Sequence, residues 1–341
     1  MYERGEGLNI YDFTMEKLGL FLRENGENPA KAGMIFDGIY KRGIRDFSEF
    51  GFCERVTKKL SALDFVELKT VRRLENESAG KLLLELPDGN FCETVLMRQR
   101  FGACVCVSTQ VGCSMGCKFC RSGQIKRRRN LTAGEIVGQV LAIKREFGCD
   151  IYGVSVMGIG EPFDNFEATR DFCEIVTEDK GLAVGKRHVT VSTCGLVPEI
   201  MRFADSARPT SLAVSLHAPN DTLRNELMPI NRKYPISEVL KAAEYYTEKT
   251  GKRVTLEYIM LGGVNDTREH AEELCRVIDG RDFYVNLIPY NSTDCGFTKS
   301  SPETISAFCA ALKENGVVAT KRREFGAELN AACGQLLSDY T

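Results

Sequence analysis

The sequence has no long apolar run and almost no net charge. No stretch approaches the roughly 20 apolar residues that a helix needs to span a bilayer. The first residues, MYERGEGLNIYDF, lack the apolar centre of a secretory signal. The formal net charge of −2 also lacks the basic excess of many nucleic-acid-binding domains. We therefore expect a cytoplasmic protein with no membrane partner, and composition alone does not point to nucleic acid.

The 14 cysteines are too dilute in 341 residues for a small disulfide-stapled fold. Without an export signal, such cysteine usage indicates metal-binding or catalytic thiols for a subset and small buried hydrophobic residues for the rest. Cys149, Cys173, Cys275 and Cys309 lie in or beside helix-like apolar patterns, so we assign these four to the core. A hydrophobic content of 43% and this length suit one large domain, or a large one and a small one.

From about residue 100, short β-rich runs alternate with longer helical patterns. This alternation predicts βα units and a parallel sheet. About six units are too few for an eight-stranded barrel, and no G-x-G-x-x-G follows the first strand, which argues against a dinucleotide-binding fold. We expect an open, partial barrel with its site at the carboxyl ends of the strands. The predicted strands are 103–109, 151–159, 188–194, 211–217, 253–261 and 284–290, and the helices between and after them are 132–148, 165–178, 197–205, 236–249, 267–279 and 302–315.

The first 90 residues have a different pattern. Helical segments near 11–25 and 30–42 precede KLLLELPDGNFCETVLMRQ, which predicts a β-hairpin that turns at Asp88 and Gly89. We expect an α/β chain in three parts: a mainly helical accessory domain at 1–90, the partial barrel at 91–320, and a tail at 321–341. The tail contains Cys333 between small residues.

Three cysteines form the pattern C-x3-C-x2-C within VGCSMGCKFCRSG. Cys113, Cys117 and Cys120 are interleaved with glycines, so this stretch is a loop and not a helical core stripe. Zinc sites with four cysteines generally have two C-x2-C pairs, and no second pair exists, since Cys104 and Cys106 are only one residue apart. An iron–sulfur cluster held by three thiolates is the alternative that we favour. It leaves one iron open to a substrate or cofactor.

Polar residues follow several of the predicted strands. Each is weak evidence by itself, because serine, histidine and asparagine at strand ends often cap turns. Because such residues recur at the ends of successive strands, together they predict a ring around a ligand site. The ring consists of Gly160 and Glu161 in MGIGEPFDN, Ser192 in VSTCG, Ser215, Leu216 and His217 in SLHAPND, and Asn291 in NLIPYN.

The cysteine pattern, with Phe119 before the last cysteine, resembles the radical S-adenosylmethionine superfamily. In those enzymes the cofactor chelates the open iron and is cleaved to a 5′-deoxyadenosyl radical. The strand-end motifs, with LMPINRKYP, GGVND and AACGQL, resemble one family over essentially the whole chain: the RlmN/Cfr family of radical RNA adenine methyltransferases. The resemblance implies a partial (β/α)6 barrel, one 4Fe–4S cluster on Cys113, Cys117 and Cys120, and two S-adenosylmethionine molecules per turnover bound by the ring residues.

The resemblance also implies three catalytic residues. Cys333 is first methylated and then supplies its methyl group to the base as a carbon radical. Glu93 accepts the proton that the base loses, although a glutamate on a strand is by default a solvated residue. Cys106 attacks the sulfur of Cys333 and releases the methylated base, which leaves a transient disulfide. We therefore predict that Cys106 faces Cys333.

The implied substrates are an adenine of 23S rRNA and adenine 37 of tRNAs, both methylated on carbon 2. The base must be unpaired or flipped to be reached. The sequences GEP at 160–162 and SLHAPND resemble the carbon-2 branch, and the alternative is the carbon-8, antibiotic-resistance branch. We expect a monomer that takes electrons from an external, flavodoxin-like donor. The run KRRRN at 126–130 is either a solvated face or a contact to the RNA backbone.

Two other function classes stay open on the residues alone. A non-enzymatic iron–sulfur or RNA-binding protein needs neither the ring of polar groups nor the pair Cys106 and Cys333. A radical enzyme with an unrelated substrate predicts that Cys333 is never methylated. Anaerobic reconstitution and mass spectrometry of the C-terminal peptide separate these classes.

Overall fold

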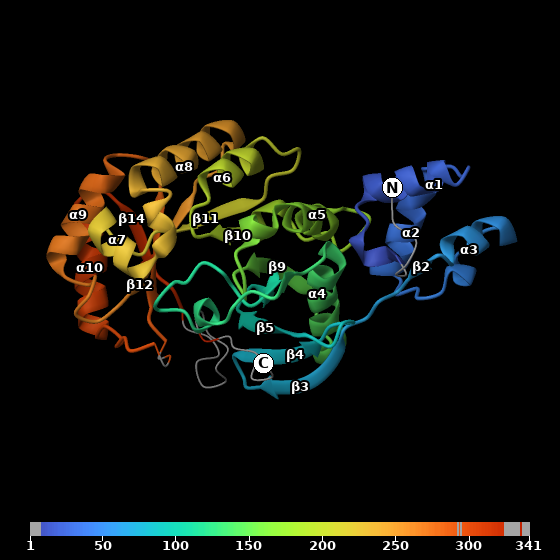
Figure 1. Cartoon of the computed structure of the whole chain (residues 1–341), viewed down its shortest axis with the longest axis horizontal. Coiled ribbons are helices and arrows are strands. Elements are labelled where there is room, and N and C mark those ends of the chain that lie inside the picture. Colours follow the sequence, from blue (N-terminus) through green and yellow to red (C-terminus); the bar gives the residue numbers. More distant parts are fainter. Residues whose placement is uncertain (1–7, 292, 294, 324–334, 336–341) are drawn as a thin grey trace.

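A ten-stranded sheet forms the centre of the computed structural model of the chain, which describes residues 8–291, 293, 295–323 and 335 (Figure 1). The order of its strands is β14-β13-β12-β11-β10-β9-β6-β5-β4-β3. Seven strands are parallel, and β3, β4 and β5 are antiparallel additions at one edge.

The parallel strands include all six that the sequence predicts, so the α/β partial-barrel prediction is confirmed. All six end earlier than predicted, because their last residues turn into the loops at the carboxyl edge. These strands are β6 (Gly102–Cys106), β9 (Ile151–Val156), β10 (Val189–Thr193), β11 (Ser211–Ser215), β12 (Thr255–Met260) and β13 (Tyr284–Pro289). The seventh, β14 (Val318–Lys321), pairs with β13 and was not predicted.

Helices cover one face of the parallel strands (Figure 1). The six predicted helices are α4 (Ala133–Phe147), α5 (Phe166–Thr177), α6 (Val197–Ala204), α8 (Ile236–Thr250), α9 (Arg268–Ile278) and α10 (Pro302–Glu314). A shorter helix, α7 (Asp221–Leu227), follows β11. A capping box begins α4, since Thr132 accepts from the backbone of Glu135 while the Glu135 side chain accepts from the backbone of Thr132.

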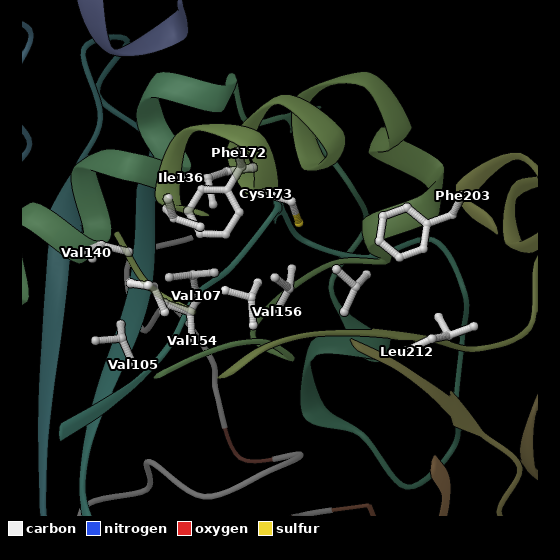
Figure 2. Close-up of a cluster of buried hydrophobic side chains, with 14 of the residues drawn as sticks. Val105, Val107, Ile136, Val140, Val154, Val156, Phe172, Cys173, Phe203 and Leu212 are labelled. Atoms are coloured by element: carbon white, nitrogen blue, oxygen red, sulfur yellow. The ribbon is translucent and has the colours of Figure 1, made fainter. Parts of the chain in front are cut away.

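The core between this helical layer and the sheet is apolar (Figure 2). Valines of β6 and β9 and the segment after β6 pack beneath Ile136 and Val140 of α4 and Phe172 of α5 (Figure 2). β-branched side chains suit a parallel strand that is covered on its faces. Cys173 belongs to this core, and Cys149, Cys275 and Cys309 pack against it, as the sequence predicted.

The first residues form a helical unit beside the sheet, at the end opposite α9 and α10 (Figure 1). It contains α1 (Met15–Glu24), α2 (Lys31–Tyr40), α3 (Glu54–Leu60) and the short parallel pair β1 (Leu8–Asn9) and β2 (Leu63–Asp64). Asp12 accepts from the backbone N–H of Gly134 at 2.6 Å, and Lys17 pairs with Asp171 of α5. These contacts attach the helical unit to α4 and α5.

The predicted hairpin is present, with Gly89 at φ +79° in its turn. Its strands, β4 (Ala79–Glu85) and β5 (Phe91–Gln99), are paired with β3 (Lys69–Glu75) on one side and with β6 on the other. The expected boundary after residue 90 falls inside this hairpin, and the boundary after residue 320 falls inside β14. The strands β3, β4 and β5 at one edge, and β14 at the other, therefore continue the barrel sheet.

Cys333 lies outside the described residues. Among the described residues, no helix is long and apolar enough to cross a membrane.

Candidate active site

A pocket lies at the carboxyl edge of the parallel strands, where the cysteine loop meets the strand ends. All three cysteines of the C-x3-C-x2-C pattern line it. So do five residues of the predicted ring: Gly160, Glu161, Ser192, Ser215 and His217. The structure therefore brings together segments from β9, β10, β11 and the loop, which are far apart in the sequence.

The cysteine loop is held by its backbone. Cys113 N–H donates to the carbonyl of Ile125 at 3.0 Å, and Lys118 N–H donates to the carbonyl of Leu227 at 3.0 Å. Gly112 has φ +78°, and a Cβ there would lie 2.5 Å from the carbonyl oxygen of Lys126. Only glycine fits this close approach, which folds the loop back over the pocket.

Burial disfavours the ionised form of all three thiols. It raises the pKa of Cys113 to about 12 and that of Cys117 well above its ordinary value, and the other thiols of the loop and Glu161 add to the rise. A buried trio of thiols becomes a set of thiolates only around a strongly positive group, such as the irons of a cluster. No group of three or more described His, Cys, Asp or Glu residues converges on a single metal ion. The chemistry of three thiols on one open pocket fits a group with several metal atoms, each reached by one thiolate.

Glu161 is a buried carboxylate that supports the pocket wall. Its two oxygens accept backbone N–H bonds from Phe163 at 3.0 Å and from Cys194 at 2.8 Å. Burial raises the pKa of Glu161, and these N–H donors oppose the rise. Gly160 beside it has φ +111°, and a Cβ there would lie 2.7 Å from Thr109 Oγ1. The GEP motif thus brings backbone and carboxylate close to the cysteine loop.

His217 is neutral, and its tautomer follows from its contacts. Burial, with the nearby Arg224 charge, lowers the pKa of His217 to about 3. Nδ1 accepts the backbone N–H of Ile259 at 3.0 Å, so the ring proton is on Nε2. Phe119 meets the ring edge to face, with centroids 4.9 Å apart. His217 has φ +59°, a strained backbone that is stabilised by the bond from Asn265 to its carbonyl.

Arg224 of α7 is fully buried and ties two strand ends together. Its guanidinium donates to the carbonyls of Cys194 at 2.7 Å, Ser215 at 3.0 Å and Leu216 at 3.1 Å. It also donates to Asn231 Oδ1 at 2.7 Å. The carboxyl ends of β10 and β11, which carry Ser192 and Ser215, are therefore held by one cation.

A second charge network lines the pocket at β12 and just after β14. Glu257 of β12 accepts from Asn286 at 2.8 Å and lies 3.9 Å from the guanidinium of Arg322. Burial raises the pKa of Glu257, and Arg322 and Asn286 oppose the rise. Arg322 also donates to the Met157 sulfur at 3.6 Å. Arg322 follows β14 directly, so the chain leaves the sheet for the tail at the pocket.

Two predicted ring residues do not line the pocket. Leu216 is buried, and its backbone N–H donates to the carbonyl of Glu257 at 3.0 Å. Asn291 is buried just after β13. Sequence reasoning missed Cys194, although it stands in the quoted VSTCG, and Glu257, a charged residue inside an apolar strand pattern. Arg322 had no such signal, because β14 was not predicted.

Glu93 and Cys106 lie on neighbouring strands and face the same side of the sheet. Cys106 of β6 is opposite Val95 of β5, and Glu93 is two residues before Val95. Val95, Cys106 and Ile159 form a small buried cluster, and Met157, which also lines the pocket, packs against it. The antiparallel addition to the barrel therefore brings Glu93 onto the same face as Cys106, whose cluster adjoins the pocket wall.

A family profile described as the radical SAM superfamily matches residues 107–277. The chain belongs to this superfamily. It is 47% identical to the "Probable dual-specificity RNA methyltransferase RlmN" of Clostridium perfringens and to that of Acholeplasma laidlawii, over 97% and 96% of its length and 97% and 98% of theirs. The crystal structure of a radical SAM methyltransferase from Sphaerobacter thermophilus matches with a TM-score of 0.88 and 41% identity, over 96% of this chain and 98% of that one. Within the superfamily, the chain is a member of the RlmN family.

The transient disulfide predicted for this RlmN family member involves a residue outside the described part of the chain. Every cysteine of the sequence except Cys333 lies in the described part of the chain. Gln335, two residues after Cys333 in the AACGQL motif, is 5% exposed. The pairing of Cys106 with Cys333 stays a prediction.

The basic run of the RlmN family member divides into two kinds of residue. Arg127 pairs with Asp164, and Arg129 pairs with Asp88 and with Glu135. Lys126 and Arg128 alternate with them and are exposed, and Arg128 also donates to Asn90 Oδ1 at 3.2 Å. The run therefore contributes two structural arginines and two outward-facing cations.

We expect Arg224→Met to lower the free energy of unfolding by about 3 kcal/mol, because it leaves several buried carbonyls without a donor. Urea unfolding of the apo protein measures this loss. Arg208→Met is the matched control, since Arg208 is a half-exposed arginine in an ion pair with Glu178. Equal effects of the two changes would contradict the role assigned to Arg224.

Proposed function

We propose that this protein methylates carbon 2 of an adenine in 23S rRNA and of adenine 37 in tRNAs. The proposal rests on one combination: a pocket lined by three loop cysteines and polar strand ends, in a chain 47% identical over 97% of its length to a relative named as a dual-specificity RNA methyltransferase. The cellular setting that this implies is the cytoplasm. We further propose a monomer that receives single electrons from a flavodoxin-like donor.

Cys113, Cys117 and Cys120 would hold a 4Fe–4S cluster, whose open iron binds S-adenosylmethionine and supplies its reductive cleavage. Glu161 has lone pairs left beside its two backbone bonds, and these accept from the cofactor's amino group. Ser192 and Ser215 offer hydroxyls, and His217 offers its Nε2 proton as a donor. The apolar contacts of Phe119 and Met228 in the same pocket keep water out. Leu216 and Asn291, the two ring residues that do not line the pocket, are buried, and we assign them a role in supporting the strand ends.

Carbon 2 of adenine lies between two ring nitrogens and is electron-poor, so it does not attack a methyl cation donor. A carrier carbon on Cys333 avoids this limit, because a carbon radical adds to such a centre. Two S-adenosylmethionine molecules are then consumed in each turnover, one to methylate Cys333 and one to activate the methyl group.

The adduct that forms on addition carries an unpaired electron. Glu93 takes the proton from carbon 2, and the cluster that Cys113, Cys117 and Cys120 would hold would take up that electron, which leaves a closed-shell thioether. Cys106 as thiolate then attacks the sulfur of Cys333. The S–S bond forms, the bond from sulfur to the methylene carbon breaks, and its electron pair stays on that carbon, which gains a proton to become the methyl group. Glu93 and Cys106 support this sequence by sharing one face of β5 and β6 beside the pocket.

Methylation of adenine on carbon 8, the other activity of the same family, is the second candidate function. Nucleoside mass spectrometry of rRNA and tRNA after reaction distinguishes the two activities, with 2-methyladenosine and 8-methyladenosine as standards. We expect 2-methyladenosine in both RNAs. Formation of 8-methyladenosine would transfer the protein to the other branch, and no methylated adenosine in either RNA would overturn the proposal.

Cys333→Ala should abolish methyl transfer to RNA, because no carrier carbon remains. Wild-type protein incubated with S-adenosylmethionine should gain a methyl group on the C-terminal peptide, read by mass spectrometry. Cys309→Ala is the control, since this half-buried cysteine packs against the core away from the pocket. An unmethylated Cys333 in active wild-type protein would exclude the carrier mechanism.

Cys106→Ala should stop the reaction after base addition and trap a covalent adduct between RNA and Cys333. Denaturing gels with labelled RNA detect the adduct. Cys104→Ala, two residues earlier on the same strand, serves as control and should release product normally. Product release by Cys106→Ala at the wild-type rate would show that another group resolves the adduct.

Lys126→Ala with Arg128→Ala should weaken RNA binding and reduce the slope of log K against log salt by about 2, one for each lost phosphate contact. Binding is measured at several salt concentrations. The control is Lys241→Ala with Lys313→Ala, two exposed lysines on α8 and α10. An unchanged affinity and slope would leave the basic run as a solvated face.

A further inference from the structure

Lys81 and Glu93 form a buried ion pair on the inner face of the antiparallel addition. The ammonium of Lys81 lies 2.6 Å from Glu93 Oε1, and the two side chains are 9% and 3% exposed. Lysine is among the residues that proteins bury least often. A buried pair of this kind calls for a reason beyond stability, because apolar residues of similar size often serve stability as well or better.

The surroundings of the pair connect it to the pocket. Lys81 of β4 stands directly opposite Val95 of β5, and Val95 stands opposite Cys106 of β6. Lys81, Glu93, Val95 and Cys106 therefore face one side of the sheet. Val95 packs with Cys106, Ile159 and Met157 in a small apolar cluster, so the ion pair borders apolar side chains, beside which either charge alone would be strongly disfavoured.

The backbone holds Glu93 in register as well. Ser108 Oγ donates to the carbonyl of Glu93 at 2.7 Å and accepts from the N–H of Ile159 at 3.0 Å. Thr94 Oγ1 donates to the carbonyl of Cys106 at 2.9 Å. The position of Glu93 relative to Cys106 is thus set by strand pairing, and the Lys81 ammonium is the cation in contact with its carboxylate.

We propose that Lys81 is a positioning residue that keeps Glu93 ionised and oriented for proton removal from the substrate adenine, an inference that rests on the proposed function. A proton acceptor must be a carboxylate when the base adds to Cys333, and burial alone favours the neutral acid. The ammonium stabilises the carboxylate. When Glu93 takes the proton from carbon 2, the ion pair becomes a neutral acid beside an ammonium, and the proton passes on from there to solvent.

The test compares Lys81→Met and Lys81→Arg with the wild-type holoenzyme and RNA substrate. Three quantities are measured: methylation of Cys333, covalent RNA adduct, and released methylated RNA. We expect Lys81→Met to methylate Cys333 normally, to accumulate adduct, and to release product at least about 100-fold more slowly, the range for a lost acid–base group. Lys81→Arg restores part of the rate, because it restores the charge.

Lys69→Met is the matched control. Lys69 pairs with Glu85 at 2.9 Å between β3 and β4, and its side chain is 76% exposed. This variant loses an ion pair between strands of the same sheet, but that pair is exposed to solvent. We therefore expect Lys69→Met to behave as wild type. Product release by folded Lys81→Met within about threefold of the control, without adduct, would overturn the proposal.

A double variant keeps the test decisive if Lys81→Met destabilises the fold. Lys81→Met with Glu93→Gln removes both charges and leaves no unpaired one. If Lys81 acts through Glu93, the double variant is as slow as Glu93→Gln alone, and a further multiplicative loss contradicts the proposal. Failure of Cys333 methylation in the wild-type protein would instead refute the proposed function. The experiment therefore distinguishes failure of the proposed function from failure of the role assigned to Lys81.

Discussion

Parallel hydrogen bonding of six consecutive βα strands is the constraint on which the site depends. Because β6, β9, β10, β11, β12 and β13 run in one direction, their carboxyl ends meet at one edge of the sheet. Residues separated by long helices in the sequence become neighbours there. The cysteine loop, which leaves the first of these strands, closes over the same edge and completes the pocket.

Buried charged side chains near this edge contact polar groups of other strands or segments of the chain. Arg224 links the ends of β10 and β11 through their carbonyls. Glu257 and Arg322 link β12 to the segment that follows β14. Lys81 and Glu93 link β4 to β5 on the face that Cys106 shares. A buried charge is tolerated only with such partners, so these contacts also define where the wall of the pocket stands.

Much of the architecture could be predicted from local pattern. The six βα units, the capping box of α4 and the hairpin turn at Gly89 each follow from periodicity or turn chemistry within a few residues. Two further pocket residues could have been predicted: Glu257 is a charged residue in an apolar strand pattern, and Cys194 stands in the strand-end motif VSTCG. No local pattern in the sequence predicts that β5 pairs with β6 or that β14 joins the sheet. Which strands become neighbours depends on contacts between distant segments. Arg322 reaches the pocket only because β14 joins the sheet.

The sequence by itself determined the cysteine loop, the order of the βα units and the residues at the strand ends, since spacing, glycine content and apolar periodicity are local properties. Only the tertiary structure decided that the hairpin extends the barrel sheet and brings Glu93 onto the face of Cys106. It also decided that Lys81 is buried against Glu93, because the register of antiparallel strands sets which side chains meet across them.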